Sequence, residues 1–142
     1  MTVPKLELQG VSKAFDDKPV LRDVDLVVAP HEVVCLIGSS GSGKSTMLKC
    51  VNLLVPIDEG SILLDGADIT ASGVNANQVR EEMGIVFQAF NLFPHMTVLD
   101  NITLSPRKVH GVRKAQAEER ARKLLQGFGL ADKVDEYPDR LS

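Results

Sequence analysis

Residues 38–46 read GSSGSGKST, and this stretch decides how the rest of the chain is interpreted. It fits the pattern G-x-x-x-x-G-K-[ST] of loops that cradle phosphate groups, with Gly38, Gly43, Lys44 and Ser45 at the fixed positions. Glycines let successive backbone N–H groups converge on phosphate oxygens, and the start of a helix adds partial positive charge. The stretch therefore indicates a nucleotide-phosphate site.

The residues on either side of the loop support this interpretation. Residues 32–37 are almost uninterruptedly apolar and predict a parallel strand buried on both faces. Residues 47–54 contain neither Gly nor Pro and predict a buried helix. A flexible Ser/Gly-rich linker is the alternative, but a linker is not expected directly after an apolar strand.

Each residue type in the loop has a chemical task. Lys44 supplies a point charge for the β- and γ-phosphates, and the Ser45 hydroxyl is placed to ligate Mg²⁺. We predict that nucleotide contacts come from the whole loop: Gly38, Ser39, Ser40, Gly41, Ser42, Gly43, Lys44, Ser45 and Thr46.

Composition narrows the classes of protein to consider. The 142 residues carry a net charge of −3, with 44% hydrophobic and 25% charged residues, as in an ordinary globular domain. A basic face for nucleic acid is not expected. The chain shows neither an apolar run near the ~20 residues of a membrane span nor a signal-peptide core, which favours the cytosol. We expect Cys35 and Cys50 to be reduced core residues.

Alternating polar and apolar residues predict two antiparallel strands, over residues 5–9 and 21–28. The turn-rich connection between them carries Phe15. An aromatic ring near a phosphate site can stack on adenine, or it can simply close the end of a hairpin. The spacing alone does not decide between these two roles.

Phosphate loops of this kind usually work with an acidic residue at the end of a second strand. Residues 55–60 are excluded because Pro56 cannot sit in a central strand. Residues 61–66 run into an Asp-Gly turn, which predicts a hairpin. Residues 84–87 predict a second buried strand, and Gln88 at its end can orient water or complete a Mg²⁺ shell. A surface amide is the alternative for Gln88.

Beyond Gln88 the sequence becomes helical. Residues 98–104 predict a short helix, residues 113–128 an amphipathic helix, and residues 130–142 a short helix and a loop. The apolar stripe of the amphipathic helix comprises Ala117, Ala121, Leu124, Leu125 and Phe128. Two ion pairs at i, i+4 are expected on its polar side, Glu118–Arg122 and Glu119–Lys123.

An aromatic loop, a phosphate loop, a strand ending in Gln and then a helical segment follow one another along the chain. This order resembles the ATP-binding subunit of ABC transporters across the whole chain. The sequence of residues 84–98, GIVFQAFNLFPHMTV, resembles that of the family members that serve polar amino acid importers. The implied fold is α/β: a P-loop NTPase of the ABC ATPase type, with an antiparallel β-subdomain and an inserted helical subdomain. Residues 1–88 would hold the β-subdomain and the first part of the core, and residues 89–142 an incomplete helical subdomain.

The resemblance implies roles for individual residues. Phe15 would stack on the adenine of ATP, and Thr46 would approach the α-phosphate. Ser45 and Gln88 would contact Mg²⁺, and Gln88 would also contact the attacking water. Lys44 and Gln88 are thus the expected catalytic residues.

The resemblance also implies partners. A second ATPase subunit would complete the nucleotide site, and a solute-binding protein would act indirectly through transmembrane permease subunits. The permease would dock near Gln88, for which the apolar residues Phe90, Leu92, Phe93 and Met96 are suited. Packing within the helical subdomain is an equally good explanation of these four residues. The expected location is the cytoplasmic face of the cell membrane.

The chain departs from the family pattern at Leu141-Ser142, where a signature beginning Leu-Ser-Gly-Gly-Gln would start. The second acidic strand, the catalytic glutamate and the switch histidine would all follow Ser142. We therefore expect the parent protein to hydrolyse ATP, and this chain to bind ATP without turning it over. The transported solute is not encoded here, because importers of this class select it on other subunits.

Other functions remain open at this point. An ABC-type ATPase of cell division, of lipoprotein release or of another solute importer is the nearest alternative. A DNA-repair ATPase is disfavoured because no long coiled-coil insertion follows the loop. A GTPase is disfavoured because the guanine-reading pattern Asn-Lys-x-Asp is absent, and neither a GTPase nor a small-molecule kinase accounts for Gln88 with residues 90–98.

Overall fold

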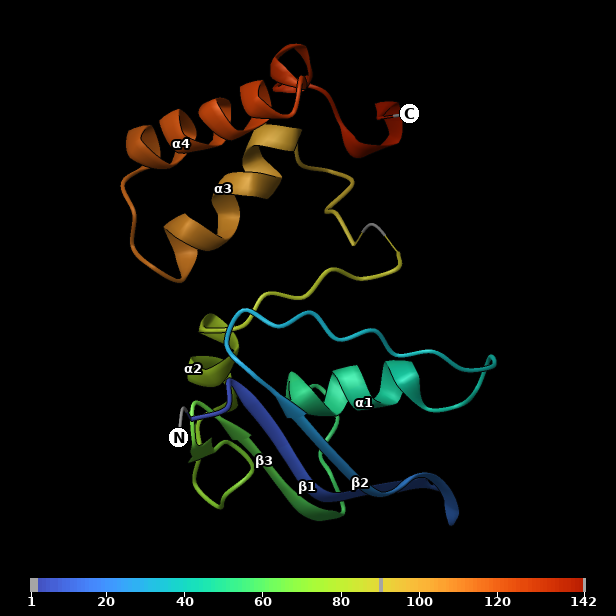
Figure 1. The fold of residues 1–142 in the computed structure, drawn as a ribbon. Helices are drawn as coiled ribbons and strands as arrows, with labels where there is room; N and C mark the ends of the chain where they lie inside the picture. The colour runs from blue at the N-terminus through green and yellow to red at the C-terminus, as the bar shows by residue number, and fades with distance from the viewer. Residues whose placement is uncertain (1–2, 90, 142) are drawn as a thin grey trace. The chain divides into compact units, whose positions relative to one another are not determined.

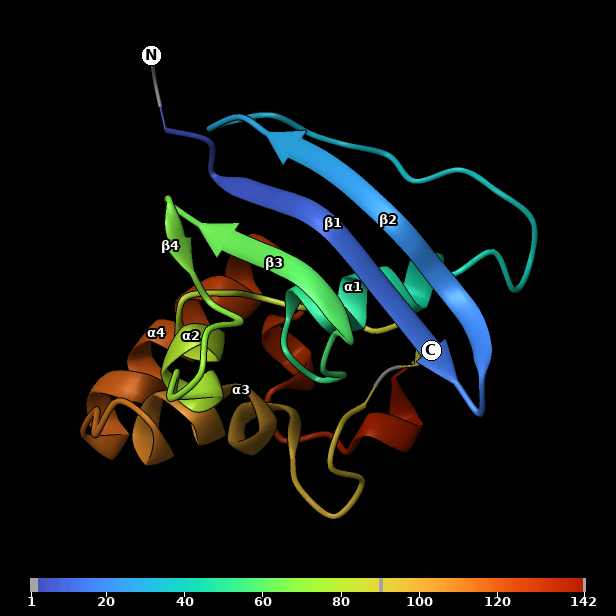
Figure 2. The same cartoon turned by 90° about the horizontal axis from the view of Figure 1, so that it is seen from below.

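Four antiparallel strands form the sheet of the N-terminal half, in the order β2-β1-β3-β4 (Figure 2). Their bounds are β1 Leu6–Phe15, β2 Lys18–Val28, β3 Glu59–Leu64 and β4 Ala67–Asp68. The two antiparallel strands expected from residues 5–9 and 21–28 are confirmed, and β1 continues as far as Phe15.

The computed structural model describes residues 3–89 and 91–141. It divides into two units, an N-terminal unit Met1–Val86 and a C-terminal unit Phe87–Ser142 (Figure 1). The N-terminal unit holds the sheet with helices α1, Lys44–Val51, and α2, Ala76–Glu81. The C-terminal unit holds α3, Val98–Lys108, and α4, Lys114–Gly127, with two 3₁₀ turns, η1 Ala131–Lys133 and η2 Pro138–Arg140.

Two short turns fix the register of the sheet. Asp16 and Asp17 join β1 to β2 with φ of 47° and 60°, and Asp65 and Gly66 join β3 to β4 with φ of 49° and 81°. Positive φ at both central residues is typical of the type I′ turn, whose twist matches that of the strands. The hairpin predicted at residues 61–66 is therefore confirmed.

The core of the N-terminal unit lies between the sheet and α1, which runs along one face of it (Figure 2). Its fully buried side chains are Leu8, Val11, Ile62 and Cys50. Burial raises the pKa of the Cys50 thiol. The charge of Lys13 lowers this pKa and that of Asp58 raises it, both by less than burial does. The expected buried helix begins at Lys44 and ends at Val51, earlier than residue 54.

The two apolar segments expected as buried parallel strands, residues 32–37 and 84–87, are not strands in this structure. Val33, Ile37 and Val86 are 87%, 95% and 99% exposed, and Cys35 is exposed as well. Within the described residues every strand pairing is antiparallel, and neither segment joins it. An extended segment without a partner strand gains no ladder hydrogen bonds, so apolar composition alone does not make it a strand.

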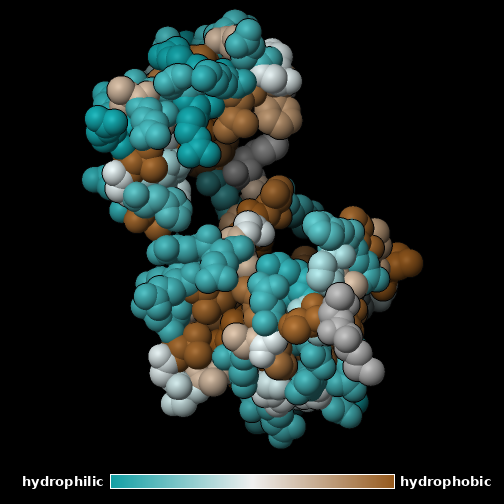
Figure 3. Space-filling model, turned by 60° about the vertical axis from the view of Figure 1, so that its left-hand side comes forward, coloured by the Kyte–Doolittle hydropathy of each residue, from teal (hydrophilic) through white to brown (hydrophobic). Residues whose placement is uncertain are grey.

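The core of the C-terminal unit comprises Val98, Leu99, Ala121, Leu125 and Val134. The stripe expected on residues 113–128 is partly wrong. Ala117, Ala121 and Leu125 are buried, but Leu124 is 57% exposed and Phe128 is 79% exposed. Small alanines let α4 lie close to its neighbours, and the resulting contact face is narrower than the full apolar stripe. Both units expose hydrophobic areas among hydrophilic ones (Figure 3).

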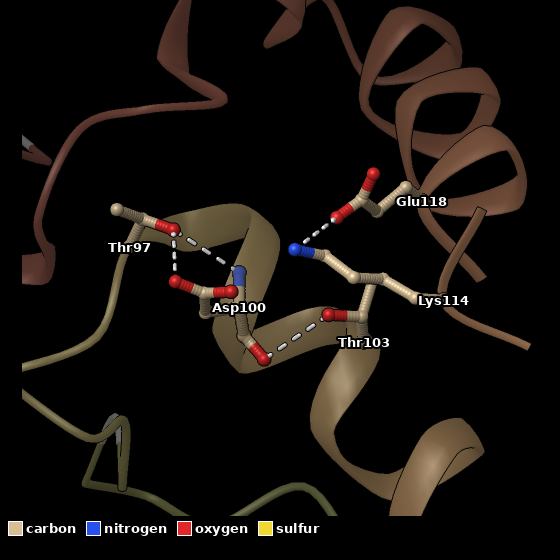
Figure 4. A network of polar contacts seen from close by, with 5 residues as sticks. All are labelled: Thr97, Asp100, Thr103, Lys114 and Glu118. Carbon is tan, nitrogen blue, oxygen red and sulfur yellow. Dashed lines mark hydrogen bonds and ion pairs between the residues drawn. The ribbon is translucent and has the colours of Figure 1, made fainter.

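Side-chain hydrogen bonds begin α3 (Figure 4). Thr97 Oγ1 accepts from the Asp100 backbone N–H at 3.1 Å and donates to Asp100 Oδ2 at 3.0 Å. This reciprocal arrangement satisfies a backbone donor that the first turn of a helix leaves free. Thr103 is buried and donates to the Asp100 carbonyl at 3.4 Å, which keeps its hydroxyl satisfied in the core.

The polar side of α4 carries two i, i+4 ion pairs. Glu119 and Lys123 meet at 2.7 Å, as expected. Glu118 contacts Lys114 at 3.6 Å, one turn before it (Figure 4), instead of the Arg122 that we expected one turn after it. Among the described residues, none of the helices is long and apolar enough to cross a membrane.

Candidate functional site

The phosphate-binding loop leads directly into α1, and Lys44 is the first residue of that helix. Its Nζ donates to the carbonyls of Gly38 at 2.8 Å and Ser39 at 2.7 Å, and to Ser42 Oγ at 3.2 Å. The ammonium group is therefore held at the centre of the loop by neutral oxygens. The positive charge would therefore already be in position when an anion enters the loop. The N–H groups of Lys44 could then exchange their present acceptors for oxygens of the anion.

Glycine is required at position 43 for two reasons. Gly43 is the N-cap of α1 with φ of 91°, a left-handed conformation that side chains disfavour. A Cβ at this position would lie 2.9 Å from the Val20 carbonyl oxygen of β2 and 3.1 Å from Leu21. The loop thus packs its backbone directly against the hairpin, which fixes the entry into α1.

Phe15 and the loop border the same hollow, of about 260 Å³. It is lined by Phe15, Val20, Gly41, Ser42, Gly43, Lys44, Ser45 and Thr46. Phe15 is 45% exposed at the end of β1, so part of its ring is accessible. Phe15 and Lys44 lie 29 positions apart in the sequence. They reach the same hollow because β2 returns beside β1 and touches the loop.

The chemistry of this hollow fits the phosphate chain of a nucleotide with a hard metal ion. One wall offers an ammonium group and the N-terminus of α1, which both attract anions. The first turn of α1 carries no acidic side chain that would repel a phosphate. The exposed hydroxyl of Ser45 is an oxygen ligand of the kind that Mg²⁺ prefers.

The remaining predicted residues belong to the C-terminal unit. Gln88 is exposed and lies in a stretch without strand or helix, so it does not stand at the end of a buried strand as expected. Leu92 and Phe93 are exposed, and Met96 is half-buried. Phe90 lies outside the described residues.

Two residues near the site are not indicated by any pattern in the sequence. Lys13 and Asp58 form an ion pair of 2.6 Å beside Phe15, although they lie 45 positions apart. Such pairing depends on how β1 and β3 align, and no local spacing in the sequence indicates it. Asp58 lies directly before β3, which begins at Glu59.

Comparison with known proteins identifies the family. A family model described as ABC transporter matches residues 21–142. The chain belongs to the ABC transporter family. The resemblance inferred from Phe15, the phosphate loop and residues 84–98 is thereby confirmed.

Relatives in this ABC family are amino acid transport proteins. The chain is 45% identical to the glutamine transport ATP-binding protein GlnQ of Escherichia coli and 44% identical to the glutamate transport ATP-binding protein GluA of Corynebacterium efficiens. Each match covers 137 residues, 96% of this chain and 57% of the relative. The chain thus spans less than two thirds of the length of these relatives.

A solved ABC structure supports the fold. The cbiO1 protein of Clostridium perfringens, part of the ABC transporter complex cbiONQ, matches with a TM-score of 0.81 at 23% identity. The match covers 98% of this chain and 56% of that protein. The α/β architecture with an antiparallel sheet and a helical segment is therefore that of an ABC ATPase.

Proposed function

We propose that this chain is the ATP-binding part of a subunit that powers amino acid import by binding and hydrolysing ATP. One observation carries the proposal. Phe15 lies in the same hollow as Gly41–Thr46, so an aromatic surface and an anion cradle share one site. That combination suits a molecule with a flat base at one end and phosphates at the other. The printed functions of the relatives, transport of glutamine and glutamate, support amino acids as the solute class.

The residues of the chain take distinct roles in this proposal. The loop from Gly38 to Thr46 donates backbone N–H groups to the phosphates, and Lys44 neutralises their charge. Phe15 stacks on the adenine. Ser45 and Gln88 are the proposed Mg²⁺ ligands, and Gln88 also orients the attacking water. When bound, Mg²⁺ would supply positive charge between phosphate oxygens.

The proposed partners follow from the family. ATP binding and hydrolysis would drive conformational changes of permease subunits in the membrane. A second ATPase subunit would complete the nucleotide site, and a solute-binding protein would deliver the amino acid. The exposed side chains of Leu92 and Phe93 suit a contact with the permease, for which Phe90 and Met96 are also proposed. The protein would then work at the cytoplasmic face of the membrane.

Titration of the chain with ATP and Mg²⁺ tests the nucleotide site. Lys44→Ala is expected to weaken ATP binding about 10- to 100-fold, since a charge-assisted hydrogen bond is worth about 1.5–3 kcal/mol. Lys49→Ala is the matched control, because Lys49 is an exposed lysine in the same helix. Equal ATP affinities of Lys44→Ala and the unaltered chain would contradict the proposal, as would a strong preference for GTP over ATP.

Reconstitution tests the transport role. The full-length parent protein is combined with its permease subunits and a periplasmic amino-acid-binding protein in vesicles, and ATP hydrolysis is followed. We expect an amino acid bound to the binding protein to stimulate hydrolysis, and Lys44→Ala to abolish it. Hydrolysis that responds only to a lipoprotein or to another solute class would redirect the assignment to another ABC system.

A further inference from the structure

The end of β1 that carries Phe15 pairs with β2 but not with β3. The last residue of β1 paired with β3 is Ser12, opposite Glu59, where β3 begins. Figure 2 shows β1 and β2 continuing beyond this point. On the other side Ala14 pairs with Pro19, which has no N–H to donate. Beyond Ser12, the β3 side of the strand end therefore relies on a contact other than strand pairing.

Asp58 provides that contact. Its Oδ2 accepts from the Ala14 backbone N–H at 2.7 Å, and its Oδ1 accepts from Lys13 Nζ at 2.6 Å. The backbone N–H of Asp58 also donates to the Ser12 carbonyl at 2.9 Å. The hydrogen bond from Lys13, followed by that from Ala14, lowers the pKa of Asp58. One residue thus ties three consecutive positions of β1 to the start of β3.

Lys13 connects this contact to the aromatic ring. Its side chain is only 11% exposed, and its Nζ lies over the Phe15 ring, 5.4 Å from the centroid. Lys13 and Phe15 are two positions apart in a strand, so their side chains share one face. A cation at this distance attracts the face of the ring and restricts its orientation. Asp58, Lys13 and Phe15 therefore form a continuous chain of contacts that ends in the hollow.

We propose that Asp58 and Lys13 are positioning residues that hold the Phe15 ring for stacking on the base of an adenine nucleotide. This inference rests on the proposed function, because it presumes that the hollow binds ATP. It assigns a base-specific effect to an ion pair that touches neither the base nor the phosphates. The effect is therefore separable from any effect on the phosphate loop.

The test compares two ligands, ATP and inorganic tripolyphosphate, by isothermal titration in the presence of Mg²⁺. Both engage the phosphate loop, but only ATP has a base. The test variants are Asp58→Asn and Lys13→Met. The matched control is Asp65→Asn, because Asp65 forms an equally short ion pair, 2.7 Å from Lys5, at the opposite end of β1.

We expect Asp58→Asn and Lys13→Met to weaken ATP binding about three- to tenfold, within the contribution of one stacked base. Tripolyphosphate affinity should change less than about twofold, which also shows that the variants are folded. Asp65→Asn should leave both affinities unchanged. Equal losses for both ligands, or unchanged ATP affinity in both variants, would overturn the inference while leaving the proposed function intact. If the unaltered chain bound neither ligand, the proposed function itself would fail, and this inference with it.

A double-mutant cycle with Phe15→Ala supplies the decisive control. Phe15→Ala alone should weaken ATP binding about tenfold and leave tripolyphosphate unaffected. In that background Asp58→Asn should cause no further loss, because its effect acts through the ring. Additive losses would show that Asp58 acts on the site by another route and would refute its role in positioning Phe15.

Discussion

The two units of the chain each hold one loop in place, and they do so in different ways. In the N-terminal unit the phosphate loop is held by tertiary packing: Gly43 lies against the Val20 carbonyl of β2, which the sheet positions. In the C-terminal unit a single side chain, Asn101, holds residues 93–97. The first arrangement depends on distant parts of the sequence, and the second is complete within nine residues.

Both polar atoms of the Asn101 side chain form hydrogen bonds. Its Oδ1 accepts from the Phe93 backbone N–H at 2.8 Å. Its Nδ2 lies 3.1 Å from the Phe93 and Met96 carbonyls and 2.9 Å from that of Thr97. Two N–H donors therefore serve three carbonyls, with one shared. Residues 93–97 are thus fixed largely by one neighbouring amide, whereas the phosphate loop is fixed by packing against β2.

Removing a buried side chain from the core under the sheet should have the largest effect on stability. Ile62 is fully buried between β1 and β4 in the core under the sheet. Ile62→Ala should lower the free energy of unfolding of the N-terminal unit by about 2–5 kcal/mol. Urea unfolding measures this loss, and ATP titration should show weakened binding as the unit loosens. Val27→Ala, at an exposed position of β2, is the control and should have little effect on either measurement.

Removing the amide should have a smaller and local effect. Asn101→Ala deletes four hydrogen-bond contacts and should cost about 1–3 kcal/mol of stability in the C-terminal unit. Amide hydrogen exchange should speed up at Phe93 and leave the phosphate loop unchanged. Asn101→Asp keeps the acceptor for Phe93 but turns a carboxylate oxygen toward three carbonyl oxygens, so it should destabilise the unit at least as much as Asn101→Ala. Faster exchange at Gly41–Lys44 would contradict the separation of the two loops.

Lowering the pH should have the smallest effect on stability, but it should distinguish the charged contact of Asp58 from the uncharged contacts of Asn101. The contact made by Asp58 is charged, and the Lys13 hydrogen bond lowers its pKa in the folded state. Its stabilising contribution is therefore present above the usual aspartate pKa and is lost as the pH falls through the lowered folded-state pKa. The difference in urea midpoint between the unaltered chain and Asp58→Asn should vanish on acidification, whereas the effect of Asn101→Ala should persist. A difference for Asp58→Asn that grew in acid would refute this assignment.

Features encoded by neighbouring residues were predictable from the sequence. The helix that follows Gly43, the Asp65-Gly66 turn and the amphipathic helix of residues 113–128 all depend on local spacing, and each forms close to where it was expected. Such features need only the conformational preferences of adjacent residues.

Features that depend on a partner were predicted less well. Residues 32–37 have the composition of a buried strand, but pairing is a property of two segments, and the described residues provide no second one. On α4, periodicity could not distinguish the buried Leu125 from the exposed Leu124, because the width of the contact is set by the helix opposite. The pairing of Lys13 with Asp58 depends on strand register in the same way.

The close approach of Gly43 to the carbonyl of Val20 also bears on ligand size. Because that contact joins backbone to backbone, side-chain rotamers cannot adjust the spacing between the hairpin end and the amides of the loop. In the proposed site, main-chain geometry therefore sets the separation between the backbone of the hairpin and that of the loop. We therefore expect a ligand whose aromatic and anionic ends are separated by too short or too long a linker to contact either Phe15 or the loop, but not both.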